Sequence, residues 1–201
     1  SVFAEHVAGA LLVAAGVDAL SRATEFALSP RVFQQLNKDE RFGGQGGHRG
    51  FTVDACASRK TRKLQRYLSR GAEGQGSEGD VRTAELAATE NYFVCPPVGL
   101  IEVVLQRVLD AGVCATVVVP NWVEKAWHVR LREHAVQAQK LPWTGYGTAT
   151  WLDVSEKKSK PHELAQWWEF AVFAVDGRPQ RQHLTRGVAA LPRWKDDRPR
   201  M

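Results

Sequence analysis

Cysteine is scarce in this sequence and long apolar runs are missing, and each shortage excludes a class of protein. The three cysteines, Cys56, Cys95 and Cys114, stand singly and form no Cys-x-x-Cys pair. This usage argues against a disulfide framework, so we expect an intracellular protein in a reducing compartment, without a bound metal. No apolar run approaches the roughly 20 residues of a membrane-spanning helix, so we expect no membrane partner.

Acidic residues are scarce in two stretches that are rich in lysine and arginine. Residues 59–70 hold six basic side chains and no acid, and residues 178–201 hold seven against two aspartates. The second stretch carries a charge of +5, the net charge of the whole protein. Both stretches could bind the phosphate backbone of a nucleic acid. The alternative, equally compatible with the sequence, is that the first is a solvent-exposed helix face and the second a solvent-exposed tail. The candidate contacts are Arg59, Lys60, Arg62, Lys63, Arg66 and Arg70, and Arg178, Arg181, Arg186, Arg193, Lys195 and Arg198.

Apolar periodicity and turn residues predict an α/β protein in three parts. Residues 1–28 are rich in alanine and leucine and are expected to form an N-terminal helical arm. Residues 29–177 are expected to form an α/β domain, beginning with a helix that Ser29 caps and Pro30 opens. Residues 178–201 form the basic C-terminal tail.

Within the α/β domain, two glycine-rich segments interrupt the regular patterns. We expect residues 43–50 to be a flexible linker, because they lack a phosphate-binding glycine pattern, and residues 71–80 to be a mobile loop. Residues 51–55 are expected to form a short strand and residues 167–175 a late core strand. A helix is expected where apolar residues recur at every fourth position, at Val123, Trp127, Leu131 and Ala135.

Residues 91–119 are the most informative stretch of the chain. A short apolar strand, 91–94, ends in the rigid turn Cys95-Pro96-Pro97-Val98. A helix is expected to follow as far as Ala111, where Gly112 terminates it, and residues 114–119 form a β-branched strand. Two strands joined by a helix of this length should lie parallel, with a right-handed crossover. Since ligands bind at the carboxyl ends of such strands, we expect a cofactor near Asp54 and a substrate at the Pro-Pro turn.

Three segments occur in an order that resembles a known family. Residues 51–58 read Phe-Thr-Val-Asp-Ala-Cys-Ala-Ser, residues 92–101 hold the strand and the Cys-Pro-Pro-Val turn, and residues 117–122 read Val-Val-Val-Pro-Asn-Trp. Together they resemble the "DxxAS" strand, the "NPPF" or "DPPY" turn and the "VVPxW" segment of phage-type (Dam-like) DNA N6-adenine methyltransferases. The copy of this domain in DIRS-type tyrosine-recombinase retrotransposons is similar over residues 5–143, and residues 6–22 resemble the C-terminal end of the RNase H that precedes it there.

The resemblance implies a Rossmann-like methyltransferase fold of three layers around a largely parallel sheet. It implies that Asp54 and Ser58 bind S-adenosylmethionine. It places the catalytic turn at Cys95, Pro96, Pro97 and Val98. In the family an asparagine or aspartate at the first position grips the target amine, and an aromatic residue at the last stacks on the flipped base. Here the thiol is a weak hydrogen-bonding group and valine has no aromatic face, so both functions are weakened.

Two hypotheses follow. In the first, the domain is a catalytically degenerate methyltransferase of retroelement origin, without a cofactor, which serves as a nucleic-acid-binding or structural subunit of a larger assembly such as a ribonucleoprotein. In the alternative, it is an active S-adenosylmethionine-dependent N6-adenine methyltransferase of a retrotransposon polyprotein. Asp54 would then hold the cofactor, and the Pro96 carbonyl would hold the amine with help from Cys95. RNase H activity is not supported, because His6 and Asp18 alone cannot form a two-metal site.

Overall fold

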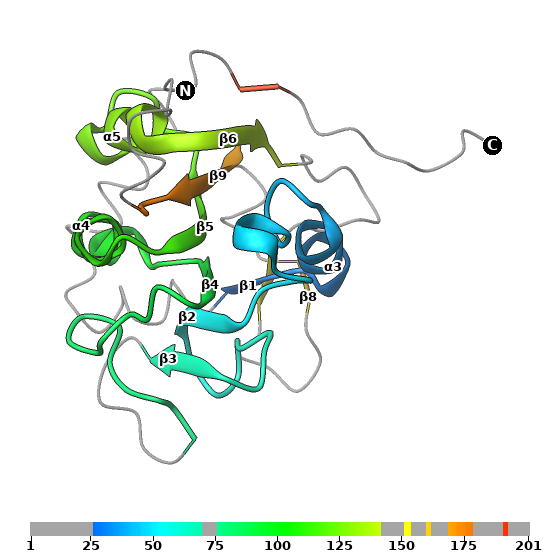
Figure 1. Cartoon of the computed structure of the whole chain (residues 1–201). Coiled ribbons are helices and arrows are strands. Elements are labelled where there is room, and N and C mark those ends of the chain that lie inside the picture. The colour runs from blue at the N-terminus through cyan, green and yellow to red at the C-terminus, as the bar shows by residue number, and fades with distance from the viewer. Residues whose placement is uncertain are drawn as a thin grey trace.

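A six-stranded sheet forms the centre of the protein, in the order β3-β2-β4-β5-β9-β6 (Figure 1). Its strands are β2 (Val53–Ala57), β3 (Tyr67–Ser69), β4 (Asn91–Val94), β5 (Cys114–Pro120), β6 (Ala135–Lys140) and β9 (Phe170–Asp176). The computed structural model describes residues 26–69, 76–141, 151–153, 160–161, 169–178 and 191–192. Strands β3, β2, β4 and β5 run parallel, and β9 runs antiparallel between β5 and β6. The protein is therefore α/β, with a mostly parallel mixed sheet that is compatible with a Rossmann-like fold.

Helices cover both faces of this sheet. Helices α4 (Ile101–Ala111) and α5 (Ala126–His134) lie on one face, and α3 (Pro30–Lys38) lies on the other (Figure 1). Neighbouring residues of β4 point to opposite sides, since Val94 packs in the cluster with α4 whereas Phe93 packs in the cluster with α3. None of the helices in the described ranges combines the length and the apolar character that crossing a membrane requires.

The predicted parallel pairing of β4 with β5 is confirmed. The two strands lie parallel, with Asn91 opposite Cys114, and every residue of β5 is buried, as expected of a strand covered on both faces. A short 3-10 helix, η2 (Val98–Leu100), leads into α4. Gly112 ends α4 in the left-handed conformation with φ 63°, as the sequence predicts.

The predicted start of α3 is also confirmed. The prediction that the N-terminal helical arm extends to residue 28 is wrong. Ser29 Oγ accepts a hydrogen bond from the Val32 amide at 3.4 Å, and Pro30 is the first helical residue. Residues 26–28 form a strand, β1 (Phe26–Leu28), which pairs with β7 (Trp151–Asp153) in a small sheet with β8 (Lys160–Pro161). Antiparallel pairing with the distant β7 makes these residues a strand, and no local signal in residues 26–28 predicts that pairing. Residues 1–25 lie outside the described ranges.

The predicted helix around Trp127 is shorter than its apolar spacing suggests. Helix α5 begins at Ala126, so Val123 lies before it and is 45% exposed, and Ala135 opens strand β6. Pairing of β6 with β9 therefore overrides the helical period. Strand β9 begins at Phe170, and the first part of the predicted strand, residues 167–168, lies outside the described residues.

The two glycine-rich segments are more ordered than expected where the structure describes them. Residues 45–47 form a short 3-10 helix, η1 (Gln45–Gly47), and the buried Gln45 amide donates to the Ala115 carbonyl at 3.2 Å and the Thr116 hydroxyl at 2.9 Å. The segment is thus a packed turn against β5 rather than a flexible linker. Residues 76–80 run beside β3, where the Glu78 amide donates to the Tyr67 carbonyl at 2.9 Å.

Candidate ligand site at the switch point of the sheet

Strands β2 and β4 are neighbours whose onward connections run in opposite directions. The chain passes from β2 outward to β3, then returns to β4 on the other side of β2 and continues to β5. The carboxyl ends of β2 and β4 therefore form the topological switch point, where ligands bind in open α/β sheets. A cleft opens there. Its walls are Ala27, Leu28, Asp54, Cys56, Ala57, Thr61, Lys63, Phe93, Cys95, Pro96 and Pro97.

The structure thus brings Asp54 to the same cleft as the Cys95-Pro96-Pro97 turn. Asp54 is only 3% exposed, and its Oδ2 accepts a hydrogen bond from the Lys63 amide at 2.6 Å. No other hydrogen bond to this carboxyl occurs among the described residues. Burial raises the pKa of Asp54 from 3.8 to about 7, against the lowering effect of the Lys63 amide and charge. The acid is therefore partly protonated at neutral pH.

Lys63 lines this cleft. The sequence predicts it as a nucleic-acid contact, together with the other basic residues of the 59–70 stretch. Burial lowers the pKa of its ammonium group, and the nearby Asp54 and Cys95 raise it in part. A lysine, a carboxyl and a thiol therefore face one another at the switch point. No local pattern predicts this contact, because Lys63 stands in a run of basic residues that is typical of a solvent-exposed segment.

Cys56 is the second residue that sequence reasoning missed. It lines the same cleft as Cys95, and neither cysteine belongs to a disulfide. Its φ of 68° is the only positive value at a non-glycine residue in the described ranges, and the pairing of β2 with β3 shifts register between Ala55 and Ala57. Such a bulge re-aims a side chain, at a cost of about 1–3 kcal/mol for the strained residue.

Two other predicted site residues do not line the cleft. Ser58 is buried, and its Oγ accepts from the amides of Lys60 at 3.3 Å and Thr61 at 3.2 Å, so it shapes the turn after β2. Val98 opens η2 and is partly buried against the apolar cluster beneath α4. It does not line the cleft beside Cys95, Pro96 and Pro97.

The cleft holds very little open space. Its free volume is about 30 Å³, enough for one or two water molecules, whereas sites for drug-sized ligands have roughly 300–1,000 Å³. Leu28 is only 1% exposed and Phe93 only 2%, and both form walls of the cleft. An adenine ring does not fit unless these walls move.

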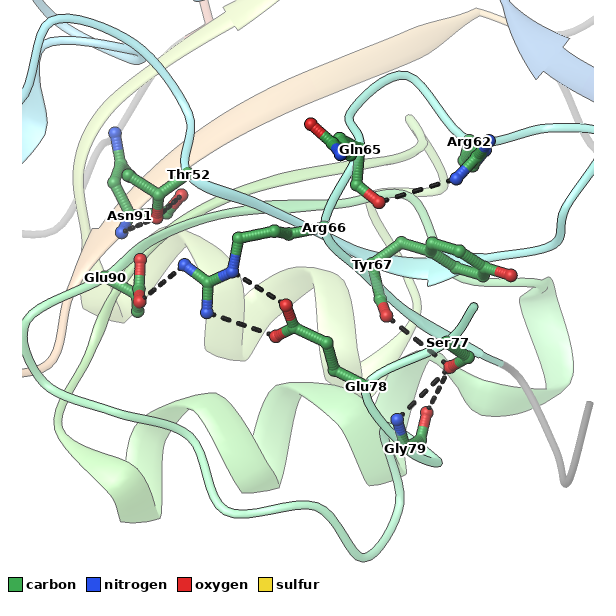
Figure 2. A network of polar contacts seen from close by, with 10 residues as sticks. All are labelled: Thr52, Arg62, Gln65, Arg66, Tyr67, Ser77, Glu78, Gly79, Glu90 and Asn91. Atoms are coloured by element: carbon green, nitrogen blue, oxygen red, sulfur yellow. Dashed lines mark hydrogen bonds and ion pairs between the residues drawn. The ribbon is translucent and has the colours of Figure 1, made fainter. Parts of the chain in front are cut away.

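The basic residues of the 59–70 stretch do not form one surface. Arg66 forms ion pairs with Glu78 and Glu90, each at 2.7 Å (Figure 2). Arg62 lies over the Tyr67 ring, 5.4 Å from its centroid. Among the described residues of this stretch, only Arg59 and Lys60 are exposed with side chains that make no hydrogen bond or ion pair, and Arg70 lies outside the described ranges.

The basic tail lies almost wholly outside the described residues. Its first member, Arg178, pairs with Asp176 at 2.7 Å. The other predicted contacts, Arg181, Arg186, Arg193, Lys195 and Arg198, lie outside the described ranges. The prediction of a nucleic-acid contact at the tail therefore stays a prediction.

A polar chain at the carboxyl end of β5 was not expected either. The His128 Nε2 and Asn121 Oδ1 atoms lie 2.9 Å apart. The Asn121 amide group donates to Glu169 at 2.6 Å, and Glu169 pairs with Lys140 at 2.9 Å. His128 is fully buried, and burial together with the Arg132 charge lowers its pKa to about 4. The imidazole is therefore neutral at physiological pH and serves to fix the segment that follows β5.

Among the residues that the structure describes, no group of acidic, histidine or cysteine side chains is suited to bind a metal ion.

The fold itself is shared by many activities, so function depends on the residues and the geometry of the site. The sequence matches no known family model, and no curated protein is significantly similar to it.

Proposed function

We propose that the protein is a catalytically degenerate, methyltransferase-like domain that serves as a nucleic-acid-binding or structural subunit of a larger assembly. Its ancestry in a retroelement rests on the resemblance of residues 51–58, 92–101 and 117–122. The observation that supports the loss of catalysis is the small size of the cleft at the switch point, which has a free volume of about 30 Å³. A nucleoside cofactor and a flipped base would both have to enter there.

The chemistry of the cleft supports the same conclusion. One oxygen of Asp54 is held by the Lys63 amide, and the raised pKa of this acid weakens it as an anionic acceptor for a cofactor hydroxyl or amine. Cys95 offers only weak hydrogen bonds to an exocyclic amine. The position after the two prolines holds Val98, which has no aromatic face and is partly buried against the apolar cluster. Each part of a methyl-transfer site is thus present in the backbone and weakened in its side chains.

Calorimetry with S-adenosylmethionine tests this part of the proposal. We expect no binding at micromolar concentrations for the native chain, and no adenine methylation by the double variant Cys95→Asn, Val98→Phe, because the turn is not the only defect. The double variant is compared with the native chain by circular dichroism to show that it folds. Micromolar binding by the native chain would favour the alternative, an active methyltransferase.

Nucleic-acid binding is tested by its salt dependence. Arg59 and Lys60 are exposed in the turn that follows β2, so they can reach a phosphate backbone. If each contacts one phosphate, replacing both by alanine reduces the slope of log K against log salt by about 1.4–1.8. The matched control replaces Lys38 and Lys125, which are also exposed, and should leave the slope unchanged. Equal slopes for both double variants would remove this contact from the proposal.

A further inference from the structure

A groove is lined by residues of α4 and α5. Both helices lie on the face of the sheet opposite α3 (Figure 1). Its free volume is about 540 Å³, within the roughly 300–1,000 Å³ that is typical of sites for small molecules and peptide side chains. It is distinct from the switch-point cleft, with which it shares no wall residue. The groove therefore has the size of a binding site, which the switch-point cleft lacks.

The groove has an apolar part. Trp127 from α5 and Leu105 from α4 line it, as does Val103 from α4, which is 46% exposed. The most exposed large apolar side chains of the described residues are Val103, Val123 and Val129. All three lie on α4, on α5 or in the turn before α5, and of the three only Val103 lines the groove.

The groove also has a cationic part without a matching anion. Arg107 and Arg130 line it, and no carboxylate pairs with either among the described residues. The Arg130 guanidinium donates to the Gln106 side chain at 2.5 Å. Arg107 donates to the Ala84 carbonyl, and its Nε is buried without a partner. Two guanidinium groups against the single Glu102 leave an excess positive charge beside the apolar surface.

We propose that this groove docks an acidic amphipathic segment of a partner protein. An apolar side chain of the segment would cover Val103 and Trp127, and a carboxylate beside it would pair with Arg107 or Arg130, as in helix-in-groove recognition. A nucleic acid suits the surface less well, because the positive charge is local to the groove: elsewhere on this layer the described residues interleave acids with bases and form no continuous cationic track. The acids are Glu102, Asp110, Glu124 and Glu133, and the bases are Arg107, Lys125, Arg130 and Arg132.

The test is a selection of short displayed peptides on the full-length protein, followed by fluorescence polarisation with the enriched peptides. We expect enrichment of sequences that combine leucine or phenylalanine with aspartate or glutamate. Arg130→Glu and Val103→Asp should each weaken binding at least about tenfold, because they remove an ion pair or bury a charge against an apolar anchor. Arg130→Gln should weaken it less than Arg130→Glu.

The controls make the same chemical changes outside the groove. Lys125→Glu reverses a charge just before α5, and Val123→Asp replaces a valine of nearly equal exposure, 45%. Both should change the affinity by less than about twofold. Urea unfolding shows that each variant is folded. Failure to enrich acidic apolar peptides, or equal losses in the control variants, overturns the proposal. Enrichment of basic peptides, or displacement of the peptide by single-stranded RNA with equal dependence on Arg130, also overturns it.

Discussion

Replacing Asp54 by asparagine separates the cost of burying a carboxylate from the hydrogen bond that the side chain makes. The asparagine oxygen can still accept from the Lys63 amide, so the bond at 2.6 Å has a substitute, whereas the charge is lost. The pKa of Asp54 rises from 3.8 in the unfolded chain to about 7 in the folded protein. Over that interval the folded state binds more protons than the unfolded state, so the stability of the native protein falls as the pH rises from 4 to 7.

The size of this loss follows from the shift. A change of about three pKa units corresponds to about 4 kcal/mol. Asp54→Asn does not titrate, so its stability relative to the native protein should rise by up to about 4 kcal/mol between pH 4 and pH 8. Urea unfolding of both proteins at each pH measures this difference. A difference that stays constant with pH would refute the assigned pKa. A difference of the opposite sign would show that Asp54 is a charged partner of Lys63.

Three further perturbations have defined outcomes. The pKa of His128 is lowered from 6.5 to about 4 in the folded protein. The unfolded chain therefore binds a proton first as the pH falls, and the native protein loses up to about 3 kcal/mol of stability between about pH 6.5 and pH 4. His128→Gln should remove that part of the pH dependence of urea unfolding, and the prediction fails if its profile parallels the native one. Cys56→Gly should be more stable than Cys56→Ala by about 1 kcal/mol, because φ is 68° there. At the neighbouring Ala57, replacement by glycine should instead lower the stability. If glycine is less stable than alanine at both positions, strain at Cys56 is excluded. Gly112→Ala should lower stability by about 1 kcal/mol, because φ is 63°. An unchanged thermal midpoint would contradict it.

The parts of the fold that depend on local signals were predictable. Ser29 and Pro30 mark the start of α3, and Gly112 marks the end of α4, because capping and positive φ need particular residue types. The parallel pairing of β4 with β5 follows from the length of the helix between them. Strand β6 was not predictable in the same way. Its residues continue the spacing of α5, and only pairing with the distant β9 makes them a strand.

The candidate site was predictable only at the level of the backbone. Asp54 and Cys95 follow from the rule that ligands meet the carboxyl ends of parallel strands. Their surroundings depend on non-local packing: the inward position of Lys63, the bulge at Cys56 and the wall formed by Leu28. The pairing of Arg66 with Glu78 and Glu90 is also non-local (Figure 2). A run of basic residues in a sequence therefore does not define a basic surface.

The position of β9 in the chain has a consequence for biosynthesis. Strands β5 and β6 are both made before β9, but they do not pair with each other. Strand β9 lies between them and pairs with seven residues of β5 and five of β6. A nascent chain that has left the ribosome only as far as Lys140 exposes two unsatisfied strand edges, which are templates for pairing with other chains. Final closure of the domain must wait for translation of residues 170–176, and a premature stop before them should yield aggregates rather than a smaller folded protein.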